Sequence, residues 1–84
     1  MNYLQLLGLA AGTITSITFI PQVIKIWKTR SAKDISVAML LLLLLGVTMW
    51  LIYGIIVKDI AIIYTNSTVL FLSLVMLYFK LKYK

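Results

Sequence analysis

Trp50 lies inside an otherwise apolar segment, where its indole could bind a ligand. It stands about seven residues from the end of that segment, which is roughly 10 Å at about 1.5 Å per helical residue. This is too deep for a tryptophan that anchors at the headgroup layer. Gly46 and Gly54, one helical turn to either side, are expected to leave open space over the indole face. An aromatic packed between helices is the alternative interpretation.

Asn66 occupies nearly the mirror position of Trp50 about the tight turn Lys58-Asp59, so we expect both side chains at the same depth. Polar groups at such a depth are costly and often functional. An indole face suits the C–H surface of a ring, and an amide suits hydroxyl groups. The pair predicts a site for a neutral, polyhydroxylated solute such as a sugar. A hydrogen bond between helices is an equal alternative for Asn66.

Pro21 and Gln22 interrupt the first apolar segment with a proline and an amide. The proline lacks a backbone donor and displaces the carbonyl of Ile17, four residues earlier. We expect a hinge here that bends during a working cycle. Several hydroxyls precede it and either satisfy the freed carbonyl or line a wet path: Thr13, Thr15, Ser16 and Thr18.

Three long apolar segments position these side chains. The chain has 84 residues, 63% of them hydrophobic, with a mean hydropathy of +1.09. Each segment is long enough for a helix to cross a hydrocarbon core of about 30 Å. We therefore predict an all-α membrane protein whose single domain, residues 1–84, is a bundle of three transmembrane helices, at about residues 3–27, 35–57 and 60–79.

Small and capping residues predict how these helices pack and begin. Gly8, Gly12 and Ser16 recur at four-residue spacing and favour the close approach of another helix. Asp34 and Ser36 are both candidates to cap the second helix, and capping is the favoured role of Asp34. Asp59 is placed to cap the third helix.

The net charge of +6 is explained by membrane topology. Seven of the eight basic residues flank the first gap or follow the third span, and Lys58 is the exception. The positive-inside rule then places the N-terminus outside and the C-terminus in the cytoplasm. The terminal lysines are expected to contact membrane lipid. No nucleic-acid partner is needed to explain the charge.

The chain lacks the residues that most catalytic and metal sites require. It has no cysteine and no histidine, and its two acidic side chains are Asp34 and Asp59, near opposite membrane faces. A nucleophile–base pair is missing, so we expect neither an enzyme nor a metal or cofactor site. Because no titratable group lies within a span, we expect facilitated, bidirectional diffusion rather than proton-coupled pumping.

Three helices enclose little by themselves, so two copies are expected to work together. Copies inserted by the same charge rule share one orientation and are related by an axis along the membrane normal. The predicted assembly is a parallel homodimer of six helices with a cavity on the axis. Each chain contributes one Trp50, one Asn66 and one Pro21.

The chain resembles the SemiSWEET family of bacterial PQ-loop sugar transporters. The resemblance covers nearly the whole chain and rests on an ordered set of motifs: Phe19-Ile20-Pro21-Gln22, then Thr29 to Ser36, then Gly46-x-x-x-Trp50-x-x-Tyr53-Gly54, and finally Asn66. It implies helices packed in the order 1-3-2 and alternating access to one central sugar site in a homodimer of the cell membrane.

The resemblance also implies a role for each motif residue. Trp50 stacks on the sugar and Asn66 binds its hydroxyls, while Pro21 and Gln22 form the hinge. Tyr53 and Asp59 resemble the outer gate, and Phe19 and Met39 an apolar inner gate. A contact between Lys58 and Asp59 is expected between chains rather than within one, since adjacent helical residues point about 100° apart.

Two other classes of protein compete with this interpretation. A holin-like pore is also short, three-spanned and basic at its C-terminus, but it needs neither Pro21-Gln22 nor a paired Trp50 and Asn66. A non-transporting membrane assembly subunit would carry no solute. Flux through liposomes separates them, because a pore leaks unrelated dyes and a carrier saturates.

Overall fold

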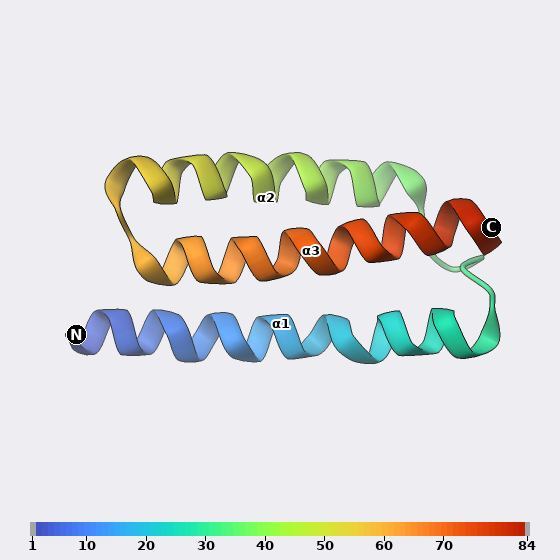
Figure 1. Cartoon of the computed structure of the whole chain (residues 1–84), viewed down its shortest axis with the longest axis horizontal. Coiled ribbons are helices and arrows are strands. Elements are labelled where there is room, and N and C mark those ends of the chain that lie inside the picture. The colour runs from blue at the N-terminus through green and yellow to red at the C-terminus, as the bar shows by residue number, and fades with distance from the viewer. Residues whose placement is uncertain (1, 84) are drawn as a thin grey trace.

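The computed structural model describes residues 2–83, which form three helices in an elongated layer (Figure 1). Helix α1 spans Tyr3–Thr29, α2 spans Val37–Val57 and α3 spans Ile60–Tyr83. All three are long and apolar enough to cross a membrane. Lys84, one of the terminal lysines expected to contact lipid, lies outside the described residues.

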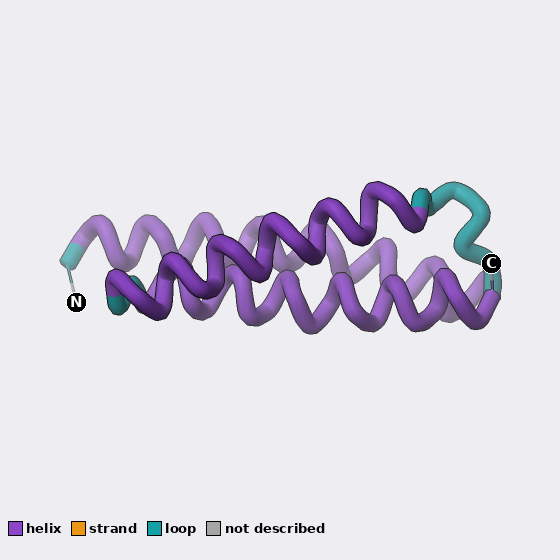
Figure 2. The backbone as a smooth tube through the Cα atoms, turned by 90° about the horizontal axis from the view of Figure 1, so that it is seen from above, coloured by secondary structure: helices purple, strands orange, loops and turns teal. Residues whose placement is uncertain are grey.

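Helix α3 lies between α1 and α2, which do not approach each other closely. The predicted order 1-3-2 is therefore confirmed. Helices α1 and α3 run parallel, whereas α2 runs antiparallel to both (Figure 1). Seen from above, α2 crosses the other helices obliquely (Figure 2). We call the end with the α1–α2 loop the loop end, and the end with the α2–α3 connection the turn end.

The start of α2 and the end of α3 differ from the predicted spans. Helix α2 begins at Val37 rather than at residue 35, because the Ser36 hydroxyl accepts a hydrogen bond from the Met39 amide at 3.3 Å. Of the two candidate caps, Ser36 is confirmed, and a capping role for Asp34 was wrong. Helix α3 continues past residue 79 to Tyr83. Lys80 and Lys82 explain the extension, since lysine is a good helix former and its charge suits a helix C-terminus.

Small residues join α1 to α3, as their spacing predicted. Gly12 and Ser16 are buried, and a side chain added at Gly8 or Gly12 would meet Ala61 or Thr65 of α3. The absence of side chains at these glycines allows the close helix approach that is common in membranes.

A buried apolar cluster lies at the loop end, where Ile26, Ala32, Leu40 and Met76 pack together. Elsewhere the helices form a single layer with extents of 42 × 21 × 13 Å, in which α3 lies between α1 and α2. A layer of this thickness encloses no continuous path. Many large apolar side chains are exposed along both faces, among them Leu7, Leu42, Ile56 and Phe71, as suits contact with lipid or another chain.

Candidate functional site

Trp50 and Asn66 lie at one level on neighbouring helices. Gly54 of α2 packs against Ile62 of α3. Because these helices are antiparallel, moving four residues back from Gly54 and four residues on from Ile62 reaches Trp50 and Asn66 together. The same reasoning in α1, from the pairing of Gly12 with Thr65, places Thr13 at this level. The depth predicted from the turn agrees with this register.

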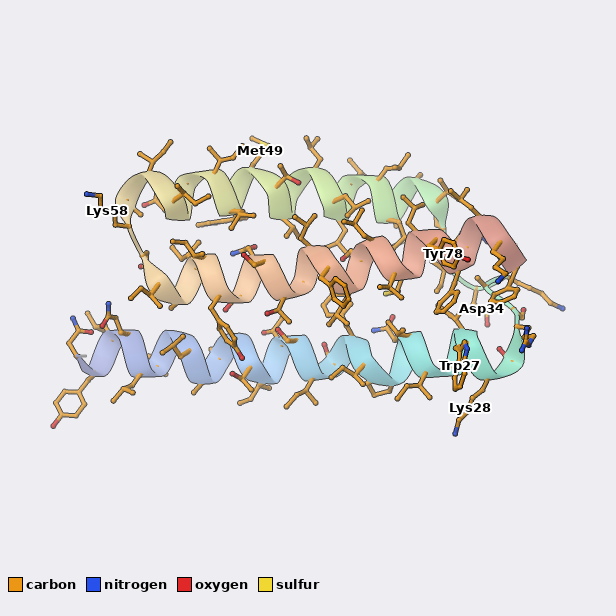
Figure 3. All side chains as sticks on the ribbon, viewed as in Figure 1. Trp27, Lys28, Asp34, Met49, Lys58 and Tyr78 are labelled. Carbon is orange, nitrogen blue, oxygen red and sulfur yellow. The ribbon has the colours of Figure 1, made fainter. Side chains whose placement is uncertain are left out.

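The indole of Trp50 is 57% exposed and lies in a neutral, aromatic setting. Its ring meets that of Tyr53 edge to face, with centroids 5.6 Å apart. Both line a shallow hollow with Met49, whose side chain points away from α3 (Figure 3). An exposed aromatic face of this kind is available to a ligand or to a second chain.

The two glycines that flank Trp50 differ in their surroundings. A side chain added at Gly46 would meet nothing within 4 Å, so the expected open space exists on that side. Gly54 is buried, and a side chain there would overlap Ile62. The expectation that Gly54 leaves space over the indole was wrong, because this glycine serves the packing of α2 on α3.

Asn66 bonds within its own helix. Its amide nitrogen donates to the carbonyl of Ile62 at 2.9 Å. The side chain lines a hollow between α1 and α3 together with Gly12 and Thr15. Within residues 2–83 the amide makes no hydrogen bond to α1 or α2, so the alternative of an interhelical bond finds no partner in this chain. The amide oxygen remains available as an acceptor.

Helix α1 stays helical through Pro21, and Gln22 bonds beside it. The Gln22 amide donates to the Thr18 carbonyl at 3.2 Å. Nearby hydroxyls donate to other carbonyls: Thr13 to Leu9, Ser16 to Gly12 and Thr18 to Thr15. Among the described residues, no side-chain hydrogen bond reaches the carbonyl of Ile17. The interpretation in which these hydroxyls bond the carbonyl freed by Pro21 is therefore not observed.

Phe19 and Met39, from different helices, line one hollow at the loop end. Its volume is about 320 Å³. Gln22 and Leu43 contribute further walls, and Met76 of α3 belongs to the same lining. We call this the loop-end hollow. Its remaining lining residues are Asp34, Ile35, Ser36 and Leu40.

Asp59 lies at the turn end, well separated from Asp34 at the loop end. Figure 3 labels Lys58 and Asp34 at these opposite ends. The Asp59 carboxylate accepts from the Ile62 amide at 3.2 Å and so caps α3, as expected. Lys58 adopts the left-handed conformation, with φ of 58°. Within residues 2–83, Lys58 and Asp59 form no ion pair, and Tyr53 and Asp59 line separate hollows.

Two contacts that sequence reasoning missed connect distant segments. The hydroxyls of Thr13 and Tyr64 lie 2.8 Å apart. The ammonium group of Lys80 donates to the carbonyl of Ala32 at 2.7 Å. Nothing in the sequence marks either pair, because threonine, tyrosine and lysine are common at such positions and 48 or more residues separate the partners.

The chemistry of the candidate site is that of binding. Trp50, Tyr53 and Asn66 carry no charge, and the acidic side chains lie at the helix ends. Among residues 2–83 no group of three or more His, Cys, Asp or Glu side chains is placed to hold a metal ion. Stacking and hydrogen bonding to a neutral ligand are what these groups offer.

Comparison with known proteins identifies the family. The model of the PQ loop repeat matches residues 3–63. The sugar transporter SemiSWEET of Bradyrhizobium diazoefficiens is 44% identical over 80 residues, which cover 95% of this chain and 93% of that protein.

Solved structures show the same fold. A crystal structure described as a bacterial homologue of SWEET transporters matches with a TM-score of 0.94 and 38% identity, over 99% of this chain and 100% of that one. A crystal structure of SemiSWEET in the inward-open conformation matches with a TM-score of 0.86 and 39% identity, over 95% and 93% of the two chains.

Proposed function

The chain belongs to the PQ-loop family and is a SemiSWEET homologue, and we propose that it carries a neutral mono- or disaccharide across the membrane by facilitated diffusion. The family is one of transporters and not of enzymes, in agreement with the sequence. The observation that carries the proposal is the placement of Trp50, an exposed aromatic residue, at the level of Asn66 on the neighbouring membrane-length helix.

The neutral surroundings of Trp50 support a neutral substrate. A sugar ring presents C–H groups to an aromatic face and hydroxyls to an amide oxygen and nitrogen. A charged solute would find no counter-charge at this depth, since Asp34 and Asp59 lie in the loop and at the turn. The absence of a carboxylate or histidine within the three helices supports uniport rather than proton coupling.

The thinness of the layer supports a parallel homodimer. Trp50 lies on open surface, and α1 and α2 do not close over α3. A second copy facing this surface would complete a central cavity with two copies of Trp50 and two of Asn66. Closed two-fold assemblies are the commonest among homo-oligomers.

Positions along the bundle support the proposed gates and hinge. Phe19 and Met39 line one hollow, so they are placed to close the path at the loop end. Tyr53 and Asp59 lie toward the turn end and would close the other side. Pro21 stands eight residues beyond Thr13 in α1, or about 12 Å from the level of Trp50 at about 1.5 Å per residue. This position between the proposed sugar site and the loop end, next to Gln22, supports a hinge role for Pro21.

The charge distribution supports a cytoplasmic loop end in the bacterial cell membrane. Lys25, Lys28, Arg30 and Lys33 lie in or beside the α1–α2 loop, and Lys80 and Lys82 lie in the last turns of α3. Basic residues of this kind are retained on the cytoplasmic side. The N-terminus would then be outside.

Uptake of labelled mono- and disaccharides into proteoliposomes tests the proposal. We expect saturable uptake that Trp50→Ala abolishes. Trp27→Ala is the matched control, because Trp27 is the other tryptophan and is similarly exposed, at 55%, but lies at the loop end. Leakage of an unrelated dye would instead indicate a holin-like pore. Absence of any sugar flux would indicate an assembly subunit, and either result would overturn the proposal.

A further inference from the structure

The last turns of α3 hold the α1–α2 loop through Lys80. Its ammonium group donates to the carbonyl of Ala32 at 2.7 Å, across 48 positions of the chain. Ala32 is only 2% exposed and belongs to the buried cluster at the loop end. A hydrogen bond from a charged donor is stronger than one between neutral groups, and more so where water is scarce.

The carbonyl that Lys80 binds opens a tight turn. The same oxygen accepts a hydrogen bond from the amide of Ile35 at 3.2 Å, which closes a turn over Ala32 to Ile35. Ser36 follows directly and caps α2. The position of Lys80 therefore bears on how the chain enters α2.

We propose that Lys80 is a positioning residue for the gate at the loop end. Asp34 and Ile35 of this turn and the following Ser36 line the loop-end hollow with Phe19 and Met39. If the bond to Ala32 is lost, the turn is released and these walls move. The path from the loop end toward the interior then opens more often.

Aromatic contacts fasten the same two segments. The guanidinium of Arg30, the residue that caps α1, lies 5.9 Å from the ring centre of Tyr83. Tyr83 stacks on Phe79 at 5.6 Å, and both rings pack against the buried cluster. The part of α1 that follows Pro21, the loop and the end of α3 thus form one connected body, which would move together about the hinge.

Lys82 provides a comparison on the same helix. Its ammonium group lies over the rings of Tyr78 and Tyr83, at 5.6 and 5.5 Å from their centres. Within residues 2–83 it makes no hydrogen bond to the loop. The two lysines therefore carry the same charge at the same end of α3, but only Lys80 binds the backbone of the turn.

Cysteine labelling tests the role of Lys80. Because the chain contains no cysteine, Leu43→Cys introduces one unique thiol in the wall of the loop-end hollow. In nanodiscs, where both faces are accessible, its rate of reaction with a polar maleimide reports opening. We expect Lys80→Met to raise this rate by about tenfold to a hundredfold, as the loss of a charge-assisted bond predicts. Lys80→Arg should restore the original rate.

Two controls separate positioning from charge and from general loosening. Lys82→Met removes the same charge and should leave the Leu43→Cys rate unchanged. Gln5→Cys places the thiol in a hollow at the turn end, and Lys80→Met should not change its rate. An unchanged Leu43→Cys rate in Lys80→Met, an equal effect of Lys82→Met, or a parallel rise at Gln5→Cys would each overturn the inference.

A gate at the loop end rests on the proposed transport function, but the labelling experiment needs no sugar. If the unsubstituted protein carries no sugar in proteoliposomes while the labelling pattern is as expected, the transport proposal fails and the role of Lys80 in holding the loop stands. If sugar uptake is normal and Lys80→Met leaves the labelling rate of Leu43→Cys unchanged, only the proposed role of Lys80 is overturned.

Discussion

The hydroxyl groups of Thr13 on α1 and Tyr64 on α3 lie 2.8 Å apart. Thr13 also lies 2.8 Å from the carbonyl of Leu9, to which it donates its one proton, so Tyr64 is the donor between the two helices. This bond joins α1 to α3 at the level of Trp50 and Asn66. Together with the small residues Gly8 and Gly12, it fixes the position of the half of α1 nearer the turn end relative to the candidate site.

Replacing Tyr64 with phenylalanine should therefore loosen α1 without leaving Thr13 unsatisfied. We expect a loss of about 0.5–1.5 kcal/mol in the free energy of unfolding, toward the lower end because such bonds in membranes average about 0.6 kcal/mol. Reversible unfolding in mixed micelles measures it. Tyr78→Phe is the matched control, because Tyr78 is 58% exposed. Equal losses in both variants would contradict the role of the Thr13–Tyr64 bond.

Alanine at Gly12 and alanine at Gly46 should have opposite effects on stability. At Gly12 the new methyl group would overlap Thr65, so α1 and α3 must separate, at a cost of about 1–3 kcal/mol. At Gly46 it meets open space, and the better helix propensity of alanine should add up to about 1 kcal/mol. Thermal unfolding of the two variants beside the parent protein tests this contrast. A destabilised Gly46→Ala would show that a second chain packs closely there.

Pro21→Ala should slow sugar exchange while leaving sugar binding nearly unchanged. The substitution restores the donor to Ile17 and straightens α1 at the proposed hinge. We expect uptake into proteoliposomes to fall several-fold. Quenching of Trp50 fluorescence by sugar, measured in a Trp27→Phe background, should give the same affinity as before. Uptake at the parental rate would exclude Pro21 as a hinge that limits transport.

An imposed pH gradient should not drive sugar accumulation. The spans carry no carboxylate or histidine at the level of Trp50, so no group there can couple a proton to the solute. Proteoliposomes with an acidic exterior should fill only to the external sugar concentration. Accumulation above that level would refute uniport, and Asp34→Asn and Asp59→Asn would then identify the coupling group.

Much of the fold could be predicted because it depends on local patterns. The three apolar runs exceed the length of a membrane-spanning helix, and the two short gaps force neighbouring spans to run antiparallel. The four-residue spacing of Gly8 and Gly12 marked the face on which α3 packs. The equal depth of Trp50 and Asn66 also followed from counting residues away from a tight turn. The helix order 1-3-2 came from the resemblance to SemiSWEET.

Other expectations depended on details that local patterns leave open. Asp34 and Ser36 both suit a helix cap, and the structure selects Ser36 because its hydroxyl reaches the Met39 amide. Gly46 and Gly54 have the same spacing from Trp50, yet one faces open space and the other faces Ile62. Four residues rotate a helix by about 400°, which is more than one full turn. Gly46 and Gly54 therefore point in different directions from the helix axis.

The sequence by itself determined that this protein spans the membrane three times, carries no charge at its candidate site and contains a proline within its first span. These properties are sums over local residues, and hydropathy and backbone chemistry decide them without reference to distant contacts. Only the tertiary structure decided that Thr13 meets Tyr64 and that Lys80 holds Ala32. Such contacts require the rotation and register of each helix, which are set by the packing of all three together.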